Sequence, residues 1–192
     1  LAGLGLMNKH SSVFFLAALA IAVLLTPLRA ELRKPWPWVA AAVALLIFLP
    51  NVVWQIAHGF PTLEDLQNVA REGKNVVLGP VEFVGQQILL LHPVLFPLWL
   101  AGLVWLVAGS GGRYRVLGWT YVLLAITLFV MKGKNYYLAP IYPMLLASGA
   151  AWLDSGLARW QATAGRAWPK AAIAVLVLAA GAATASLALP IL

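Results

Sequence analysis

The 192-residue sequence contains no cysteine, and only 10% of its residues are charged. The lack of cysteine excludes disulfide bonds and thiolate metal sites. The three histidines are scattered and do not form a zinc pattern. The scarcity of charge excludes an ordinary water-soluble domain, in which about a quarter of the residues are charged. The sequence identifies no cofactor or metal site, and a need for a divalent metal cannot be read from it.

Apolar residues are abundant instead, at 62% of the sequence, with a mean hydropathy of +0.88. A soluble fold of this length has too much surface for its volume to hide so much apolar material, whereas lipid removes the conflict. The formal net charge is +7. The basic residues lie in short clusters between apolar runs, as in membrane-protein loops, and do not form the patch or stripe typical of nucleic-acid binding. We therefore predict an integral membrane protein that does not bind nucleic acid.

A helix needs about 20 mostly apolar residues to span the hydrocarbon core of a bilayer. Six such segments occur, and none of them contains Asp, Glu, Lys or Arg. The predicted helices are residues 11–28, 38–57, 86–108, 116–131, 138–153 and 171–189. We expect Pro140 and Pro143 to kink the fifth, which membrane helices tolerate. The sequence thus predicts an all-α, polytopic transmembrane helix bundle that forms a single domain over residues 1–192.

The distribution of lysine and arginine predicts the orientation of the bundle. The first, third and fifth loops carry Arg29, Arg33, Lys34, Arg113, Arg115, Arg159, Arg166 and Lys170. The second and fourth loops carry Arg71, Lys74, Lys132 and Lys134. Cytoplasmic loops are enriched in basic residues, so we place the odd-numbered loops in the cytoplasm. The outer loops 58–85 and 132–137 are then extracytoplasmic.

The first seven residues form an apolar stub that is too short to cross a bilayer. No basic segment precedes this stub and no small-residue cleavage site follows it, so it does not have the form of a secretory signal. It resembles the last turns of a helix whose beginning is missing. We expect the chain to be a fragment of a larger protein, whose N-terminal part completes the fold.

The outer loop 58–85 is the longest polar stretch. Thr62 follows a proline and precedes Asp65 by three residues, which predicts a helix start with Thr62 as its N-cap. The apolar stripe beyond it predicts a short amphipathic helix on the membrane surface. His58, Glu64 and Asp65 are candidate acceptor-side residues, because a carboxylate here could act as a general base. Acidic residues in a first helical turn also favour the helix dipole without any catalytic role.

The clearest local pattern of chemical groups is KGKNYY at residues 132–137. Lys132 and Lys134 lie in a tight outer loop with Tyr136 and Tyr137, a combination that suits a lipid phosphate. Lys9 opens the first full helix on the same side and could join them around one anionic group. Ordinary interfacial roles explain the same residues, since lysines snorkel to headgroups and tyrosines populate the aromatic belt.

Three segments together carry a family pattern. They are GLGLMNKHS at residues 3–11, PNVVW at 50–54 followed by HGFPT at 58–62, and KGKNYYLAPIYP at 132–143. Over most of residues 1–155 the chain resembles the C-terminal portion of the bacterial glycosyltransferase family 39 membrane proteins. These are relatives of protein O-mannosyltransferases and of the transferases that add aminoarabinose to lipid A.

The resemblance implies a C-type glycosyltransferase fold in the bacterial inner membrane. Enzymes of this kind transfer a sugar from a polyprenyl-phosphate carrier to an extracytoplasmic acceptor. The resemblance also implies that the acidic catalytic base lies upstream of Leu1, so this chain alone is expected to be inactive. The phosphate would be bound by Lys132, Lys134, Lys9 and Tyr137.

Two other functions fit the sequence. A transporter or flippase component for an amphiphilic anion would carry broken helices and polar groups along a path. A non-catalytic membrane scaffold would use small residues such as Gly149 and Ala150 for close helix packing. The position of the charges at helix ends favours a lipid site at the membrane surface over a transport path.

Overall fold

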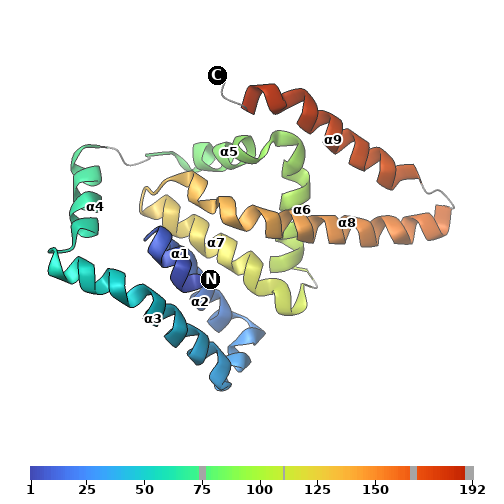
Figure 1. The fold of residues 1–192 in the computed structure, drawn as a ribbon. Coiled ribbons are helices and arrows are strands. Elements are labelled where there is room, and N and C mark those ends of the chain that lie inside the picture. Colours follow the sequence, from blue (N-terminus) through green and yellow to red (C-terminus); the bar gives the residue numbers. More distant parts are fainter. Residues whose placement is uncertain (74–76, 110, 165–167, 189–192) are drawn as a thin grey trace.

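The computed structural model describes residues 1–73, 77–109, 111–164 and 168–188. Every regular element in this part of the chain is a helix, which confirms the all-α prediction (Figure 1). Leu189 of the last predicted helix, and Lys74 and Arg166 of the charge pattern, lie outside the described residues. The α-helices are α1 Ala2–Asn8, α2 Ser12–Leu25, α3 Pro35–Ala57, α4 Pro61–Arg71, α5 Pro80–Leu91, α6 Phe96–Val107, α7 Arg115–Val130, α8 Tyr142–Ala164 and α9 Trp168–Ala188. The 3-10 helices are η1 Pro27–Arg33, η2 Pro93–Leu95, η3 Gly112–Tyr114 and η4 Asn135–Ile141.

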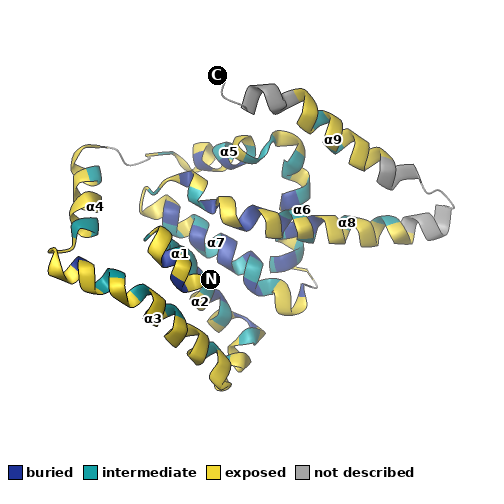
Figure 2. Ribbon diagram, viewed as in Figure 1, coloured by how far each residue is buried: buried dark blue, intermediate teal, exposed yellow. Residues whose placement is uncertain are grey.

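Many residues are exposed (Figure 2). Large apolar side chains are frequent among them, as expected of a protein whose solvent is lipid. Along α3, Trp38, Leu45 and Leu46 are each more than 60% exposed. Within the described residues, Pro35–Ala57 and Gly112–Val130 are long and apolar enough to cross a membrane. The number rises to four if each of two sharply bent helix pairs counts as one span. The chain is an integral membrane protein, and the count of six crossings stays a prediction.

The sequence predicts one continuous helix over residues 86–108, but in the structure this segment is broken at His92. Helix α5 ends before this residue, and the following η2 and α6 turn away by 100°. Pro93 is the physical reason, because its ring lacks an N–H and excludes the residue before it from helical geometry. His92 adopts φ 83, and its Nδ1 accepts a 3.2 Å hydrogen bond from the backbone N–H of Val94.

Other boundaries also differ from the prediction at prolines. The first long helix stops at Leu25, three residues before the predicted end, and Pro27 begins η1 at an angle of 100° to it. The predicted helix 138–153 starts as the 3-10 helix η4, which contains Pro140, and continues as α8 to Ala164. Proline favours these changes because it removes a helical hydrogen bond.

Helix α4 exists where the outer loop predicts it, but its first residues differ. Phe60 is the N-cap, with φ 61, and Pro61 is the first helical residue. Thr62 therefore lies inside the helix, and the prediction of Thr62 as N-cap is wrong. Its hydroxyl instead accepts a 2.6 Å hydrogen bond from Nε2 of Gln55, whose Oε1 accepts a 3.2 Å bond from the Thr62 N–H.

Helices α2, α6, α7 and α8 and the segment η4 enclose the core. Leu106, Leu138, Ile141 and Leu145 have no exposed surface. The α6–α8 crossing is the tightest, because Gly102 and Gly149 face each other's backbones and a Cβ atom on either would overlap a carbonyl oxygen of the other helix. Such small residues are typical of close helix crossings in membranes.

Helix α1 is drawn next to α3 in Figure 1. Its contact with α3 depends on Gly3, where a Cβ atom would lie 2.6 Å from the carbonyl oxygen of Ala44. This close contact fixes the start of the chain against the rest of the protein. The turn after α1 lies next to η4, and these two segments carry the cationic and phenolic residues that the sequence singles out.

Candidate functional site

The turn between α1 and α2 presents Lys9. Helix α1 ends at Asn8, and Lys9 adopts an extended conformation, with its N–H still bonded to the carbonyl of Gly5. The hydroxyl of Ser12, at the start of α2, donates a 3.1 Å hydrogen bond to the same carbonyl. Two donors on one carbonyl close the turn tightly. The side chain of Lys9 therefore leaves the backbone at a defined point at the end of two helices.

The second segment begins where α7 ends. Lys132 adopts a left-handed conformation, φ 53, and the Gly133 N–H donates a 2.8 Å hydrogen bond to the carbonyl of Leu128. This pattern closes the last turn of the helix and reverses the chain. The next residues form η4, in which the side chain of Asn135 is buried and donates a hydrogen bond to Gln86. The chain is thereby turned so that Tyr136 and Tyr137 face the α1–α2 turn.

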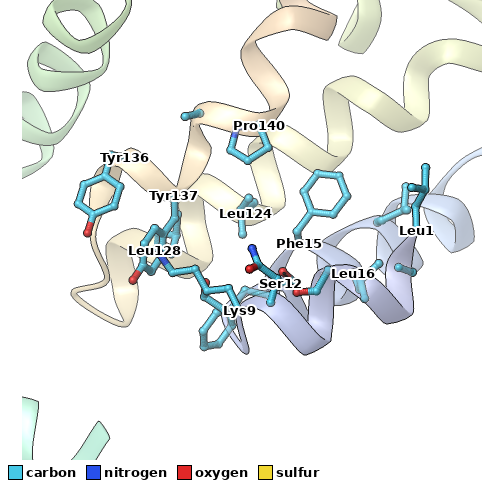
Figure 3. Close-up of a pocket in the computed structure, with 17 residues that line it drawn as sticks. Leu1, Lys9, Ser12, Phe15, Leu16, Leu124, Leu128, Tyr136, Tyr137 and Pro140 are labelled. Carbon is cyan, nitrogen blue, oxygen red and sulfur yellow. Dashed lines mark hydrogen bonds between the residues drawn. The ribbon is translucent and has the colours of Figure 1, made fainter. Parts of the chain in front are cut away.

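Lys9 and Tyr137 meet although 128 positions separate them in the sequence. The ammonium nitrogen of Lys9 lies 4.3 Å from the centre of the Tyr137 ring and 6.0 Å from that of Tyr136. The two tyrosine rings pack edge to face, with centres 4.9 Å apart. Lys134 approaches Tyr136, with its ammonium nitrogen 6.0 Å from the ring centre. Figure 3 shows Lys9 extended beside Tyr137, with Tyr136 further out.

A cavity of about 650 Å³ opens beside these side chains. Lys9, Tyr136 and Tyr137 contribute to its lining, and α2 and α7 contribute apolar side chains (Figure 3). The apolar lining includes Phe14, Phe15, Leu16, Leu19, Leu124 and Leu128. The cavity is therefore amphipathic, with a cation and two phenols adjoining an apolar interior.

The electrostatic character of the cavity follows from these residues. Lys9 supplies a positive charge, and among the described residues that form the lining there is no aspartate or glutamate. An ammonium group stacked on a phenol ring keeps its donors available to an incoming anion. This arrangement suits a molecule with an anionic head and an apolar tail. In the described part of the chain, no group of three or more histidine, aspartate and glutamate side chains could hold a metal ion.

The remaining residues predicted for the site lie elsewhere. Lys132 and Lys134 are both exposed and neither lines the cavity, and Lys134 differs only in that it approaches the Tyr136 ring. Glu64 and Asp65 are exposed on α4, which stands away from the cavity-forming helices in Figure 1. His58 stacks on Trp54 with ring centres 4.4 Å apart, and its Nδ1 lies 2.8 Å from the Trp54 carbonyl oxygen. The structure thus brings Lys9, Lys134 and the two tyrosines together and leaves the acceptor-side candidates apart from them.

Sequence reasoning missed several side chains that support this site. Asn51 bonds to His10, the neighbour of Lys9, and Gln86 and Gln87 bond to the two ends of η4. Each of these residues is a carboxamide in or beside a predicted apolar span. A carboxamide is costly in lipid unless it is hydrogen-bonded, so its occurrence in an apolar span indicates that it has a hydrogen-bond partner. The sequence does not indicate which residue that partner is.

Comparison with known proteins gives two matches. The family described as dolichyl-phosphate-mannose-protein mannosyltransferase matches residues 1–54. The lipid A galacturonosyltransferase RgtD of Rhizobium johnstonii is 31% identical over 140 residues, which is 70% of this chain. The aligned region is 29% of the length of that relative, so this chain corresponds to less than a third of it. No solved structure matches.

Proposed function

We propose that this chain, which is related to the membrane glycosyltransferases, binds the lipid-linked sugar donor of such an enzyme. The phosphate of a polyprenyl-phosphate-linked sugar would bind Lys9, Lys134 and Tyr137, and the first prenyl units would occupy the apolar part of the cavity. The sugar would then pass to an acceptor on the extracytoplasmic side of a bacterial inner membrane. The relative RgtD, named a lipid A galacturonosyltransferase, supports this reaction class.

One observation carries the proposal. The ammonium group of Lys9 lies against Tyr137 at the edge of an apolar cavity of about 650 Å³. Lys9 is exposed, and a lysine that faces lipid is unfavourable unless an anion, a carbonyl or an aromatic face stabilises it. The ring of Tyr137 supplies part of that stabilisation, and a phosphate would supply more through charge-assisted hydrogen bonds.

The chemistry of sugar transfer requires such a group. As the bond between the anomeric carbon and the phosphate oxygen breaks, the departing phosphate gains negative charge. Donors aimed at developing charge are worth about 3–4 kcal/mol of barrier in favourable cases. The acceptor hydroxyl forms the new bond and loses its proton to a base. The cavity lining contains no carboxylate among its described residues, so this chain would stabilise the leaving group and another segment would take the proton.

The proposed orientation places η4 and the loop that contains α4 outside. Lys9, Lys134 and the tyrosines then lie at the exterior leaflet, where the phosphate of an outward-facing prenyl lipid is found. The excess of basic residues in the opposite loops supports this orientation.

Binding of radiolabelled undecaprenyl phosphate to the chain in phosphatidylcholine nanodiscs tests the proposal. We expect saturable binding, and binding at least tenfold weaker for Lys9→Gln, since hydrogen bonds to charged groups contribute about 1.5–3 kcal/mol. Lys34→Gln is the matched control, because Lys34 is exposed and paired with Glu31 at 2.8 Å. Equal affinity for the uncharged alcohol undecaprenol, or unchanged binding by Lys9→Gln, would refute the proposal.

Transport of an amphiphilic anion is a second candidate, favoured by the two helix pairs bent by 100°. Discontinuous helices of this kind form substrate sites in many transporters. The break at His92 is stabilised by a local hydrogen bond to the Val94 N–H. Movement of a fluorescent short-chain prenyl phosphate between the leaflets of proteoliposomes separates the two functions. Binding without such movement supports the donor site, and rapid movement supports transport.

A further inference from the structure

Two adjacent glutamines of α5 hold the two ends of η4. Oε1 of Gln86 accepts a hydrogen bond from the side-chain amide of Asn135, the first residue of η4. Oε1 of Gln87 accepts a 2.5 Å hydrogen bond from the hydroxyl of Tyr142, the residue that directly follows η4. Consecutive helical residues point about 100° apart, so neighbouring side chains can reach two separate partners.

The Gln87–Tyr142 hydrogen bond is buried, and the Gln86–Asn135 hydrogen bond is part-buried. Gln87 and Tyr142 are each 2% exposed, and Asn135 is 7% exposed. Leaving a buried amide or hydroxyl without a partner costs far more than an exposed one, because water cannot replace the lost bond. A shift of η4 by one residue would break both bonds together. The pair of glutamines therefore specifies the position of η4 against α5.

The position of η4 determines where the phenols of the proposed site lie. Tyr136 and Tyr137 directly follow Asn135, and Lys134 is the N-cap of η4. Leu138 and Ile141, on the same segment, are completely buried and anchor its other face in the core. The same segment thus contacts α5 through Asn135 and Lys9 through the ring of Tyr137.

We propose that Gln86 is a positioning residue, which holds Asn135 so that Tyr136 and Tyr137 are presented to Lys9 and to the phosphate. This inference rests on the proposed lipid-phosphate site and adds a residue that does not itself line the cavity. Gln86 is the more informative of the two glutamines, because its partner immediately precedes the tyrosines. Gln87 holds the far end of η4, where α8 begins.

The experiment compares Gln86→Ala with Gln55→Ala in the full chain in nanodiscs. Gln55 is a matched control, because it also hydrogen-bonds through its side chain to a neighbouring helix, at Thr62, and does not line the cavity. We expect both variants to lower the thermal unfolding midpoint. We expect Gln86→Ala alone to weaken undecaprenyl phosphate binding, by about fivefold to tenfold, as follows from losing one positioning hydrogen bond.

A second readout needs no ligand. The methylene protons of Lys9 next to its ammonium group lie near the Tyr137 ring, so their NMR shift in selectively labelled protein reports whether the contact persists. We expect Gln86→Ala to move this resonance towards its value in a Tyr137→Leu variant, and Gln55→Ala to leave it unchanged. The double variant Gln86→Asn, Asn135→Gln exchanges the two amides and should restore both the shift and the affinity. If Gln86→Ala fails to fold, Asn135→Ser provides the same comparison.

The outcomes separate the two proposals. If wild-type protein binds no prenyl phosphate but Gln86→Ala still displaces the Lys9 resonance, the donor site fails and the positioning contact stands. An unchanged resonance together with unchanged affinity in Gln86→Ala would overturn the positioning role. Equal effects of Gln86→Ala and Gln55→Ala on the Lys9 resonance would also overturn it, since they would reflect a general loss of stability.

Discussion

Nε2 of His10 lies 2.8 Å from the side-chain oxygen of Asn51, across 41 positions of sequence. A carbonyl oxygen only accepts hydrogen bonds, so His10 donates through Nε2. The imidazole also packs edge to face on Phe48, with ring centres 5.9 Å apart. This pair joins the lysine-bearing turn after α1 to the C-terminal part of α3, and thereby connects two of the three sequence segments that resemble family 39.

We predict that Asn51→Ala weakens this connection. Removing the acceptor leaves a part-buried His10 donor without its partner, which should lower the free energy of unfolding by about 1 kcal/mol. Because Lys9 precedes His10, prenyl phosphate binding should also weaken, by a few-fold. Thermal unfolding in detergent and nanodisc binding measure the two effects. Val53→Ala on the same helix is the control, since Val53 is 57% exposed. Wild-type affinity in Asn51→Ala would show that Lys9 is positioned independently of this bond.

A second prediction concerns the α6–α8 crossing. Gly149→Ala places a methyl group against the backbone of Leu98, so we expect destabilisation by about 1–3 kcal/mol. Gly156→Ala makes the same substitution on the same helix, where nothing lies within 4 Å of the added atom. That control should stabilise the protein by about 0.5–1 kcal/mol through the higher helix propensity of alanine. Thermal unfolding midpoints of both variants test the prediction, and equal midpoints would contradict the tight crossing.

The cavity gives a third prediction. Leu16→Trp adds bulk to the apolar wall of the cavity and should reduce undecaprenyl phosphate affinity at least tenfold, because the prenyl chain would lose its space. Val13→Trp adds the same side chain to the same helix at a position that is 51% exposed and does not line the cavity. Its affinity should equal that of the wild type. If both variants bind equally well, the prenyl chain does not enter this cavity.

The fourth prediction tests membrane orientation and uses the natural absence of cysteine. Single cysteines at Glu64, in the first proposed outer segment, and at Met131, directly before the second, are both at exposed positions. A cysteine at Arg29, also exposed, marks the opposite side. In intact cells whose outer membrane has been made permeable, an impermeant maleimide should label the first two, and should label the third only after the inner membrane is opened. The reverse labelling pattern would show that the orientation is the opposite of the proposed one. Labelling of Glu64→Cys without labelling of Met131→Cys would show that the two segments do not lie on the same side of the membrane.

Several properties of this protein follow from composition and local pattern. The apolar content, the scarcity of charge and the long uncharged segments required a lipid-embedded, all-α chain, because the free energy of transferring a residue into lipid depends mainly on its own side chain. The motifs at residues 3–11, 50–62 and 132–143 indicated a relationship to membrane glycosyltransferases, and the matches to known proteins confirm that resemblance.

The sequence contains a signal for the two sharp bends, but it was not used to predict them. Proline at positions 27 and 93 signals a break, but membrane helices also tolerate proline with only a kink. The choice between a kink and a 100° turn depends on what packs around it. The prediction of Thr62 as the N-cap of α4 was wrong for a similar reason. The hydroxyl of Thr62 accepts a hydrogen bond from Gln55, a partner in another helix.

The sequence by itself determined that this protein is helical, membrane-embedded and rich in cations and phenols at particular turns. Only the tertiary structure decided which of those groups meet: Lys9 with Tyr137, His10 with Asn51, and Gln86 with Asn135. The physical reason is the range of the interactions. Burial in lipid and helix formation are set by residues within a few turns of one another. A hydrogen bond or a cation–ring contact between distant segments exists only when packed helices bring both partners within a few ångströms.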